Sequence, residues 1–373
     1  MKKIYILATV ALVASAACTK IETAETPETG SKIAFEVANY MSTKAAGDPK
    51  TALQAEGFTS FNTYANFFPK TGDPQAYMDN VVVSADNPTT PTVWAPARDY
   101  YWPKTGWINF YSYASTHNKV PAITFNGDKT VATAAYTNMT IAADDNFLLA
   151  DAALKQNQNL TEYTSISGVT SGVPTLFRHQ LARVNFDIKL ATTDAKMSAT
   201  TKFVVTVLNT GTTLSNLKAN NTGSLSLTNT VDAATGAHTL AWSDVKVWTP
   251  AAGVETMGFN TVTMTLPKDT KDIAAVSLLD ERTVMPQTLD DDNVFTLTYQ
   301  VETFYGDEAT PYMTEIITVT DKLATLVNSI TAWNKNTKIT YHIVIDPVGN
   351  KVTFDPAVEE WGTAEGTYSY PTA

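Results

Sequence analysis

The chain has 373 residues, a formal net charge of −11 and a pI of about 4.8. This acidic balance argues against nucleic-acid binding, because contacts with phosphates need a basic surface. Hydrophobic residues make up 44% of the chain and aromatic residues 10%, which excludes the disordered class. The composition is therefore that of a folded protein with an acidic surface.

The first residues have the layout of a secretory signal. Met1-Lys2-Lys3 gives a positive start, and the apolar run that follows has 14 residues, Ile4 to Ala17. A membrane span needs about 20, so this run is expected to be a cleaved leader. Small residues then precede Cys18, as a peptidase that cuts before cysteine requires.

Cys18 is the only cysteine of the chain, and exported proteins either pair their cysteines or avoid them. Residues 1–17 are therefore predicted to be a lipoprotein signal peptide, with Cys18 as the lipidation site. The signal resembles a bacterial lipobox, although Ser15 stands where leucine is more common. The alternative is an ordinary signal peptide cut after the same small residues, with Cys18 incidental.

Residues 18–31 are polar and predict a flexible tether. From Lys32 onward, short runs alternate apolar and polar residues with a period of two, which is typical of half-buried strands. The clearest of these runs are residues 33–37, 58–64, 107–113, 181–190, 202–208, 294–301 and 339–345. Turn-forming residues separate them, and one short helix is expected within residues 322–331. This pattern predicts an all-β chain built of β-sandwiches.

About 355 residues follow the leader, which is too many for one small core and predicts two domains. A Gly-, Ser- and Pro-rich segment at residues 168–174 lies near the middle of this part. The expected division is an N-terminal β-sandwich at residues 32–175 and a C-terminal β-sandwich at residues 176–373.

The sequence contains no recognisable catalytic constellation. None of the four histidines has a metal-binding spacing, and neither a nucleophile elbow nor a Gly-rich phosphate loop is present. The acidic runs Asp144-Asp145 and Asp290–Asp292 lack the calcium-loop pattern and are expected to be solvated loops. The aromatic segment 100–107 is either a carbohydrate platform or part of the core, and core packing is the preferred interpretation. No catalytic residue, metal site or cofactor is predicted.

Three further stretches carry motifs. Phe177–Phe186 contains the pattern H-x-x-A-R, Val284–Gln287 contains a Pro-Gln element, and Trp333–Trp361 ends in V-x-x-W. In this order, together with the lipoprotein signal and a first strand near Ile33, they resemble the fimbrillin family. Its members are the subunits of type V pili and related surface lipoproteins of Gram-negative anaerobes.

The resemblance implies two tandem transthyretin-like β-sandwich domains, in agreement with the alternating runs. It also implies that the precursor travels as a lipoprotein to the outer membrane, where a protease cuts after a basic residue in the loop behind the first strand. The strand that is released leaves a groove, and a strand of the next subunit fills it. Such contacts are head-to-tail and build an open filament.

On this sequence the implied cut lies between Lys44 and Ala45, in a loop that its Gly, Asp and Pro residues predict to be exposed. Arginine is common at this position in the family, so either a lysine-tolerant protease acts here or the chain is not cleaved. The donor strand is expected in the C-terminal tail, residues 352–373. Its apolar and aromatic positions are Val352, Phe354, Val358, Trp361, Tyr368 and Tyr370.

The sequence therefore predicts a structural or accessory subunit of a cell-surface pilus that supports adhesion and is not an enzyme. The expected partners are other pilus subunits and, before processing, the outer membrane through the lipid. The expected location is the outer membrane and the cell surface. The alternative is a surface lipoprotein of the same fold that stays monomeric or sits at the pilus tip, where it binds a glycan or a host protein.

Overall fold

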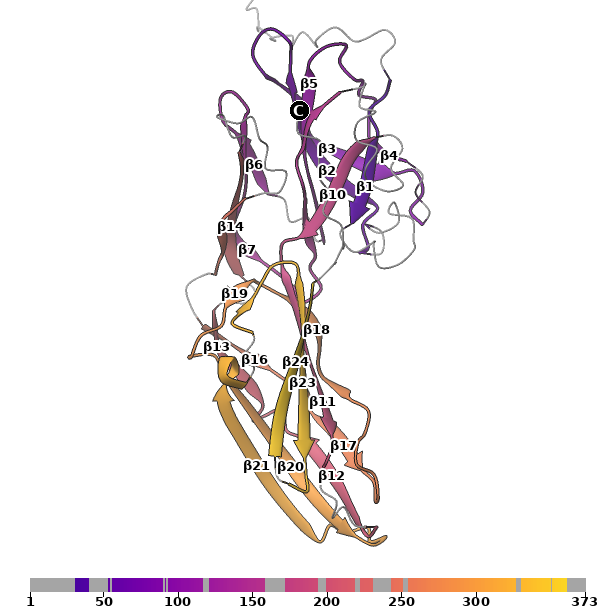
Figure 1. Cartoon of the computed structure of the whole chain (residues 1–373), viewed down its shortest axis with the longest axis vertical. Coiled ribbons are helices and arrows are strands. Elements are labelled where there is room, and N and C mark those ends of the chain that lie inside the picture. Colours follow the sequence, from indigo (N-terminus) through magenta and orange to yellow (C-terminus); the bar gives the residue numbers. More distant parts are fainter. Residues whose placement is uncertain are drawn as a thin grey trace, which may run out of the picture.

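A computed structural model describes residues 31–39, 53, 56–89, 91, 93–116, 121–157, 172–193, 199–218, 222–230, 243–250, 254–326, 330–349 and 351–360. These residues form an elongated molecule in which an N-terminal half is stacked end to end on a C-terminal half (Figure 1). Nearly all of its regular structure is β-strand, and the all-β prediction is confirmed. The helix α2 (Leu323–Leu326) falls within the segment where a short helix was expected. Across the described ranges, no helix has the length and apolar character needed to cross a membrane.

Seven strands of the N-terminal half close into a barrel-like ring, called here the N-terminal ring. Their order is β2 (Ser60–Phe68), β3 (Gln75–Ala85), β4 (Trp94–Pro96), β1 (Phe35–Asn39), β10 (Val173–His179), β8 (Phe147–Ala150) and β5 (Trp107–Ser115), and β5 pairs back onto β2. The strand β9 (Ala153–Gln156) is attached to β5. An aromatic-rich core that includes Phe61, Trp94 and Phe110 fills the ring. Closure was not predicted, because alternation along a strand defines its buried face and not its partners.

A second sheet covers one side of the N-terminal ring. Its strands, in order, are β15 (Ser243–Pro250), β14 (Thr222–Thr230), β7 (Val131–Thr140) and β6 (Ala122–Phe125). The hairpin β14–β15 comes from the second half of the sequence yet pairs with β7, and Figure 1 shows β14 beside β7 and β6. Side chains such as Tyr111, Tyr136 and Phe147 form a separate core cluster on this side.

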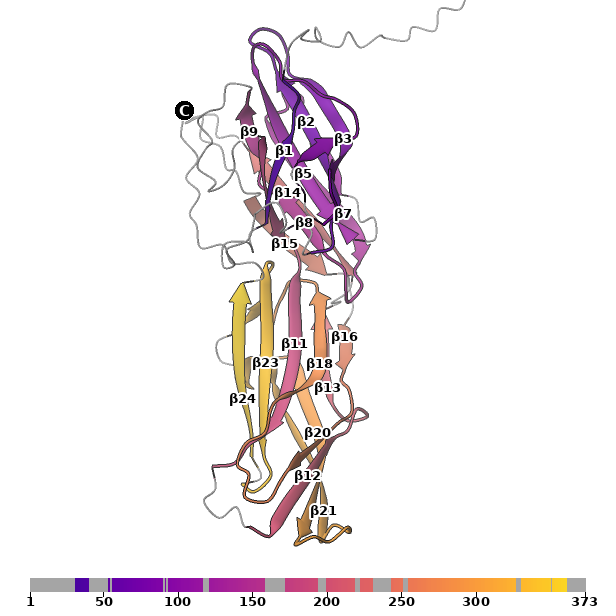
Figure 2. The same cartoon turned by 90° about the vertical axis from the view of Figure 1, so that its right-hand side faces the viewer.

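The C-terminal half is a sandwich of two sheets around one large core. One sheet has the order β18 (Val276–Val284), β11 (Ala182–Leu190), β23 (Thr337–Asp346) and β24 (Lys351–Glu360), as Figure 2 shows. The other has the order β16 (Val254–Gly258), β13 (Thr213–Lys218), β20 (Val294–Tyr305), β12 (Thr201–Val207) and β17 (Val262–Leu266), with β21 (Met313–Lys322) on the free side of β20. The strands β19 (Gln287–Thr288) and β22 (Ala332–Trp333) form a separate two-stranded sheet. Buried side chains of both large sheets, among them Phe186, Phe295 and Tyr341, make up this core.

The predicted domain boundary, between residues 175 and 176, falls within a single strand. This strand is β10, which runs from Val173 to His179. The strand β11 follows after two residues and belongs to the C-terminal half. The link between the halves is therefore short at this point. The division of the chain into two domains stays a proposal.

Candidate assembly site at strand β1

The strand β1 lies inside the N-terminal ring, between β10 and β4. It runs parallel to β10 over five residue pairs, from Phe35↔Val173 to Asn39↔Phe177. On its other side it pairs with β4 only at Phe35↔Trp94, and the amide of Ile33 donates to the carbonyl of Tyr100 at 2.8 Å. The strand β1 is thus held by one complete ladder and one partial ladder.

The side chains of Ile33, Phe35 and Val37 point into the core of the N-terminal ring and are almost completely buried. The ring of Phe35 makes edge-on contacts with Phe61 and Phe110, with 5.5 Å between ring centroids in both pairs. Such contacts add to the stabilisation that aromatic burial provides. Loss of β1 would therefore leave both an apolar groove and unpaired backbone groups on β10.

The chain approaches β1 closely at Gly172, the residue directly before β10. This glycine has a φ of 145°, a region that side chains with a Cβ rarely adopt. A Cβ here would lie 3.0 Å from the amide nitrogen of Glu36 and 3.1 Å from the carbonyl carbon of Phe35. The position requires glycine because the groove for β1 leaves no room beside its backbone.

The predicted processing residues Lys44 and Ala45, and the predicted lipidation residue Cys18, lie outside the described residues. Leu53 is described and is completely buried in the same core cluster as β1. The amide of Phe58 donates to its carbonyl at 3.2 Å. The segment behind the predicted cut is therefore anchored in the core of the N-terminal ring independently of β1.

The residues predicted as the donor strand begin in β24. This strand lies at the edge of the C-terminal sheet with the order β18, β11, β23 and β24. Ten residue pairs join β24 to β23. Val352 and Phe354 are only partly buried against the C-terminal core, and Val358 is 54% exposed. The other predicted donor residues, Trp361, Tyr368 and Tyr370, lie outside the described residues.

The three motifs behind the family resemblance meet where the two halves touch, a region called here the junction. Leu181 of the first motif and Met285 of the second are both completely buried in the core cluster that contains Tyr111 and Phe147 of the N-terminal half. Asn336 of the third motif donates its amide to the carbonyl of Leu181 at 2.9 Å. The motifs were recognisable in the sequence, but their convergence was not.

Two hydrogen bonds of Thr283 cross the junction, and a third hydrogen bond lies within the C-terminal core. The hydroxyl of Thr283, on β18, donates to the carbonyl of Asp145 at 2.8 Å, and its amide donates to the carbonyl of Ala143 at 2.7 Å. Within the C-terminal half, the indole N–H of Trp333 donates to the hydroxyl of Tyr341 at 2.9 Å, and burial raises the pKa of Tyr341 well above its ordinary value. The junction is thus built from both apolar packing and main-chain hydrogen bonds.

A buried polar network lies beside the junction. The amide group of Asn146 donates to Glu56 Oε2 at 2.7 Å, and its oxygen lies 2.8 Å from His179 Nδ1. Burial holds the pKa of His179 well below its ordinary value, and the nearby charge of Arg183 acts in the same direction. Burial also raises the pKa of Glu56, because a charged carboxylate is poorly solvated there. The network therefore favours a neutral His179 that donates through Nδ1.

The aromatic segment around residue 100 mostly belongs to the core, as the preferred interpretation had it. Tyr100 and Trp102 are buried in the core of the N-terminal ring. Trp107 is 36% exposed and stacks on Phe68, with ring centroids 5.7 Å apart and planes 6° apart. The indole of Trp107 is therefore accessible from solvent, whereas the ring of Phe68 is buried.

The prediction of solvated acidic loops is wrong for Asp145 and confirmed for Asp291. Asp145 is buried and accepts the amide of Ala142 at 2.6 Å. Asp291 pairs with Lys322 at 2.7 Å on the surface. In the part of the chain that the structure describes, no three His, Cys, Asp or Glu side chains are grouped to hold a metal ion.

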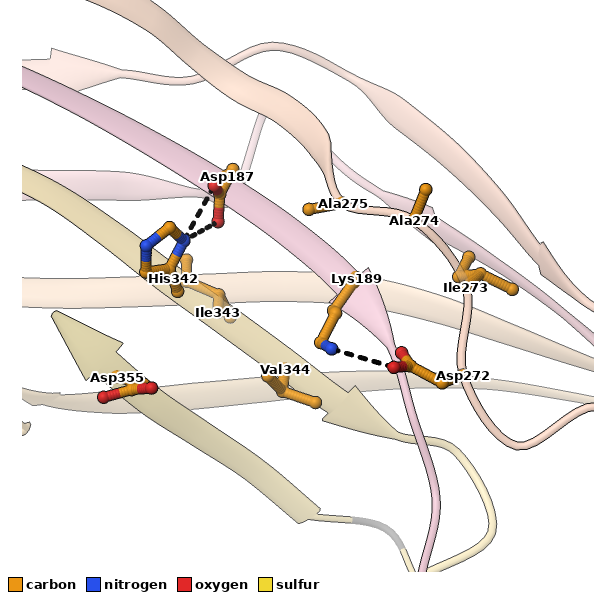
Figure 3. A pocket seen from close by; sticks show the side chains of 10 residues that line it. All are labelled: Asp187, Lys189, Asp272, Ile273, Ala274, Ala275, His342, Ile343, Val344 and Asp355. Atoms are coloured by element: carbon orange, nitrogen blue, oxygen red, sulfur yellow. Dashed lines mark hydrogen bonds and ion pairs between the residues drawn. The ribbon is translucent and has the colours of Figure 1, made fainter. Parts of the chain in front are cut away.

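The sheet of β18, β11, β23 and β24 carries on its outer face an open pocket of about 550 Å³, shown in Figure 3. Asp187, His342 and Asp355 are cross-strand neighbours there on β11, β23 and β24. His342 Nδ1 lies 2.7 and 2.8 Å from the two carboxylate oxygens of Asp187, and Lys189 pairs with Asp272 at 3.1 Å. The ten residues that line the pocket include no hydroxyl or thiol nucleophile. The contact of His342 with Asp187 thus links β23 to β11, and the ion pair of Lys189 with Asp272 links β11 to the segment before β18.

Comparison with solved structures decides which fold this is. A fimbrial protein from Bacteroides vulgatus superimposes with a TM-score of 0.53 at 15% sequence identity, and the match covers 89% of this chain and 100% of that one. The chain has the fold of a fimbrial protein. The resemblance inferred from the motifs is thereby confirmed for the fold.

Two more solved structures align with this fimbrial fold over most of its length. A candidate cell adhesion protein from Bacteroides uniformis has 15% identity and a TM-score of 0.41, with 88% of this chain and 98% of that chain covered. The fimbrial anchor protein Mfa2 from Porphyromonas gingivalis has 11% identity and a TM-score of 0.30, with 89% and 98% covered. Neither a protein-family model nor a curated protein sequence matches the chain.

Proposed function

We propose that this protein is a structural or accessory subunit of a cell-surface pilus that supports adhesion. The fold similarity to a fimbrial protein supports this role, and the two halves would correspond to the two transthyretin-like domains that the family resemblance implies. The precursor is exported as a lipoprotein through Cys18 and reaches the outer membrane. Subunits then join head to tail by exchange of a strand after proteolysis behind Lys44.

The position of β1 is the observation that carries the proposal. This strand contributes a row of buried apolar side chains to the N-terminal ring, yet it has a full ladder with only one neighbour. A cut behind it would free the strand together with Cys18, its lipid and the tether. The open groove would then present the unpaired edge of β10, and a strand of another copy can pair with that edge by β-augmentation.

The residues that follow Lys44 would keep the processed subunit folded after the cut. Leu53 and Phe58 are buried in the core of the N-terminal ring, and Glu56 is hydrogen-bonded to Asn146. Removal of residues up to Lys44 does not remove these anchors. The processed subunit would therefore keep its remaining strands and display one unoccupied groove.

The test is mild trypsin treatment of the recombinant precursor without its leader, followed by gel analysis without boiling. We expect one dominant cut behind Lys44 and a ladder of oligomers. The variant Lys44→Gln should resist this cut and stay monomeric, whereas Lys50→Gln, in the same segment of the sequence, should behave like the parent. Cleavage behind Lys44 that leaves only monomers would exclude the polymerising subunit.

The exposed indole of Trp107, which stacks on the buried ring of Phe68, favours a second candidate function. Flat aromatic faces stack on sugar rings, so a subunit at the pilus tip, or a surface lipoprotein that does not polymerise, could bind a glycan there. Loss of glycan-array signals in Trp107→Ala, with the parent's thermal stability retained, would support this role. A parent that binds no glycan on the array would exclude it.

A further inference from the structure

The motif Pro-Lys-Thr-Gly occurs twice in the N-terminal half, at residues 69–72 and 103–106. The first copy directly follows β2, and the second directly precedes β5. Phe68 and Trp107, the residues next to the two copies, form the last pair of the ladder between these strands. Both copies therefore emerge from the same end of neighbouring strands, and they are called here the paired loops.

The paired loops are in direct contact with each other. A Cβ at Gly106 would lie 2.3 Å from the carbonyl oxygen of Phe68 and 3.1 Å from the Cα of Pro69. The end of the second loop is thus packed on the start of the first. Lys70 adjoins Pro69, and Lys104 lies two residues before Gly106. Because two residues span at most about 7 Å, the backbones of both lysines lie close to this contact.

The two lysines make the paired loops a basic patch on an acidic protein. Lys70 and Lys104 are exposed, and in the part of the chain that the structure describes neither forms an ion pair. Asp73 is the one acidic residue within residues 66–76 and 100–108, whereas the whole chain has a net charge of −11. Lysines elsewhere are paired with carboxylates, namely Lys32, Lys189, Lys218, Lys268, Lys322 and Lys338.

Trp107 adds an aromatic surface beside these lysines. One face of its indole stacks on the buried ring of Phe68, with planes 6° apart. The exposed area of the indole therefore lies on its other face and its edges. Thr71 and Thr105, each next to one of the lysines, are exposed, and their hydroxyls can donate and accept hydrogen bonds. The paired loops and Trp107 together present an aromatic face, two ammonium groups and two hydroxyls.

We propose that the paired loops and Trp107 bind an acidic glycan, one whose sugar rings carry carboxylates. A sugar ring stacks on the open face of the indole, and carboxylates of the glycan accept hydrogen bonds from Lys70 and Lys104. The hydroxyls of Thr71 and Thr105 bond to sugar hydroxyls. This inference rests on the second candidate function, glycan binding at Trp107, and names the class of glycan that this function leaves open.

The combination of groups favours a sugar over an acidic peptide. The ammonium groups would attract either ligand, because a lysine acts as a point charge. The flat indole and the flanking hydroxyls instead suit a sugar ring, which presents C–H groups on its face and hydroxyls at its rim. An extended polyglutamate chain offers no ring to the indole and is therefore the comparison ligand.

The paired loops lie at the free end of the N-terminal ring. Ser115, at the other end of β5, pairs with Phe147 of the core cluster that contains Leu181 and Met285. Trp107 therefore lies at the end of β5 that faces away from the C-terminal half (Figure 1). A glycan can reach this end of the elongated molecule without meeting the C-terminal half.

Binding of a carboxylated polysaccharide tests the class of ligand. The recombinant chain without its leader is titrated with polygalacturonate, with the same polymer after methyl esterification, and with polyglutamate. We expect polygalacturonate to bind at least about tenfold more tightly than the esterified polymer, because esterification removes the charges that the ammonium groups contact. Its affinity should also fall as the salt concentration rises. Equal affinity for the esterified polymer or for polyglutamate would overturn the inference.

A double variant tests the two lysines. Lys70→Gln with Lys104→Gln should weaken the binding of polygalacturonate by about tenfold or more and keep the urea midpoint of the parent, since both side chains are exposed. Lys271→Gln with Lys351→Gln is the matched control. It removes the same charge from two exposed lysines outside the paired loops and should bind like the parent. Equal losses in the two double variants would reveal an effect of net charge alone and overturn the inference.

The outcomes separate this inference from the function on which it rests. Tighter binding of the esterified polymer than of polygalacturonate, lost in Trp107→Ala, would overturn the acidic glycan while glycan binding at Trp107 stands. A parent that binds neither polymer would overturn the inference, and the glycan array would then decide whether glycan binding itself fails. The trypsin ladder tests the pilus-subunit role independently of these results.

Discussion

Gly172 shows how a single residue makes room for a strand. Its φ of 145° and the 3.0 Å approach to the amide of Glu36 both exclude a side chain. We expect Gly172→Ala to lower the free energy of unfolding by about 1–3 kcal/mol, because the backbone must shift or adopt a strained conformation. Gly127→Ala is the control, since no atom lies within 4 Å of its added Cβ. Urea titrations that give both variants the same midpoint would contradict this role of Gly172.

Because its pKa is lowered, His179 makes the free energy of unfolding fall at acidic pH. Its pKa is lowered in the folded protein, so below the ordinary value of about 6.5 the unfolded chain binds a proton that the folded chain does not. Stability is therefore lost as the pH falls below this value. The raised pKa of Glu56 acts oppositely at pH values just above its ordinary value of 4.5, because there the folded state binds the extra proton.

The measurement is the urea midpoint of the parent and of His179→Gln at several values between pH 7.5 and 5.5. For the parent, the contribution of this one group approaches about 1.4 kcal/mol per pH unit at the acidic end of the range. The variant should lose this contribution because it has no imidazole to protonate. Parallel profiles for the two proteins over the whole range would show that His179 does not cause the dependence.

At the scale of the elements, alternation located the strands well. The runs 107–113, 181–190, 202–208 and 339–345 correspond to β5, β11, β12 and β23 with ends that differ by two residues or fewer. Alternation reports which face of a strand is buried, and these strands each bury one face or both.

The pairing of the strands could not be read in the same way. The strand β1 pairs with β10, more than a hundred residues later in the chain, and β14 crosses from the second half of the sequence to pair with β7. Period-two patterns contain no information on such distant partners. The candidate site was therefore predicted by residue types and by the family resemblance, whereas the position of β1 inside a closed ring required the structure.

The strands β1 and β24 should differ in their contribution to stability. Phe35 on β1 is buried between Phe61 and Phe110, and its truncation to alanine should cost about 3–5 kcal/mol in the uncut precursor. Phe354 on β24 is only partly buried, although its ring contacts Phe295, so Phe354→Ala should cost clearly less. Urea titration of the two variants checks this order. A larger loss for Phe354→Ala would mean that β24 is a firmly held strand, unsuited to exchange.

At the scale of the whole molecule, the junction joins two cores into one elongated body. Met285 belongs to the C-terminal half by sequence, yet it is packed with Tyr111 and Phe147 of the N-terminal half. The hydrogen bonds of Thr283 to residues 143 and 145 cross the same region. In the filament that we propose, such a joint would keep the two halves in line, because a separately folded pair of domains would hinge at a short linker.

Truncation of Met285 tests whether the junction couples the two halves. Met285→Ala should lower stability by about 2–5 kcal/mol, because it leaves a cavity between side chains of both halves. Met313→Ala on β21 is the control, since Met313 is 43% exposed and surface substitutions usually change stability by about 0.5 kcal/mol or less. Calorimetry should show one transition for the parent and for Met313→Ala, and a lowered or split transition for Met285→Ala. Two well-separated transitions already in the parent would show that the halves unfold independently and that the junction does not couple them.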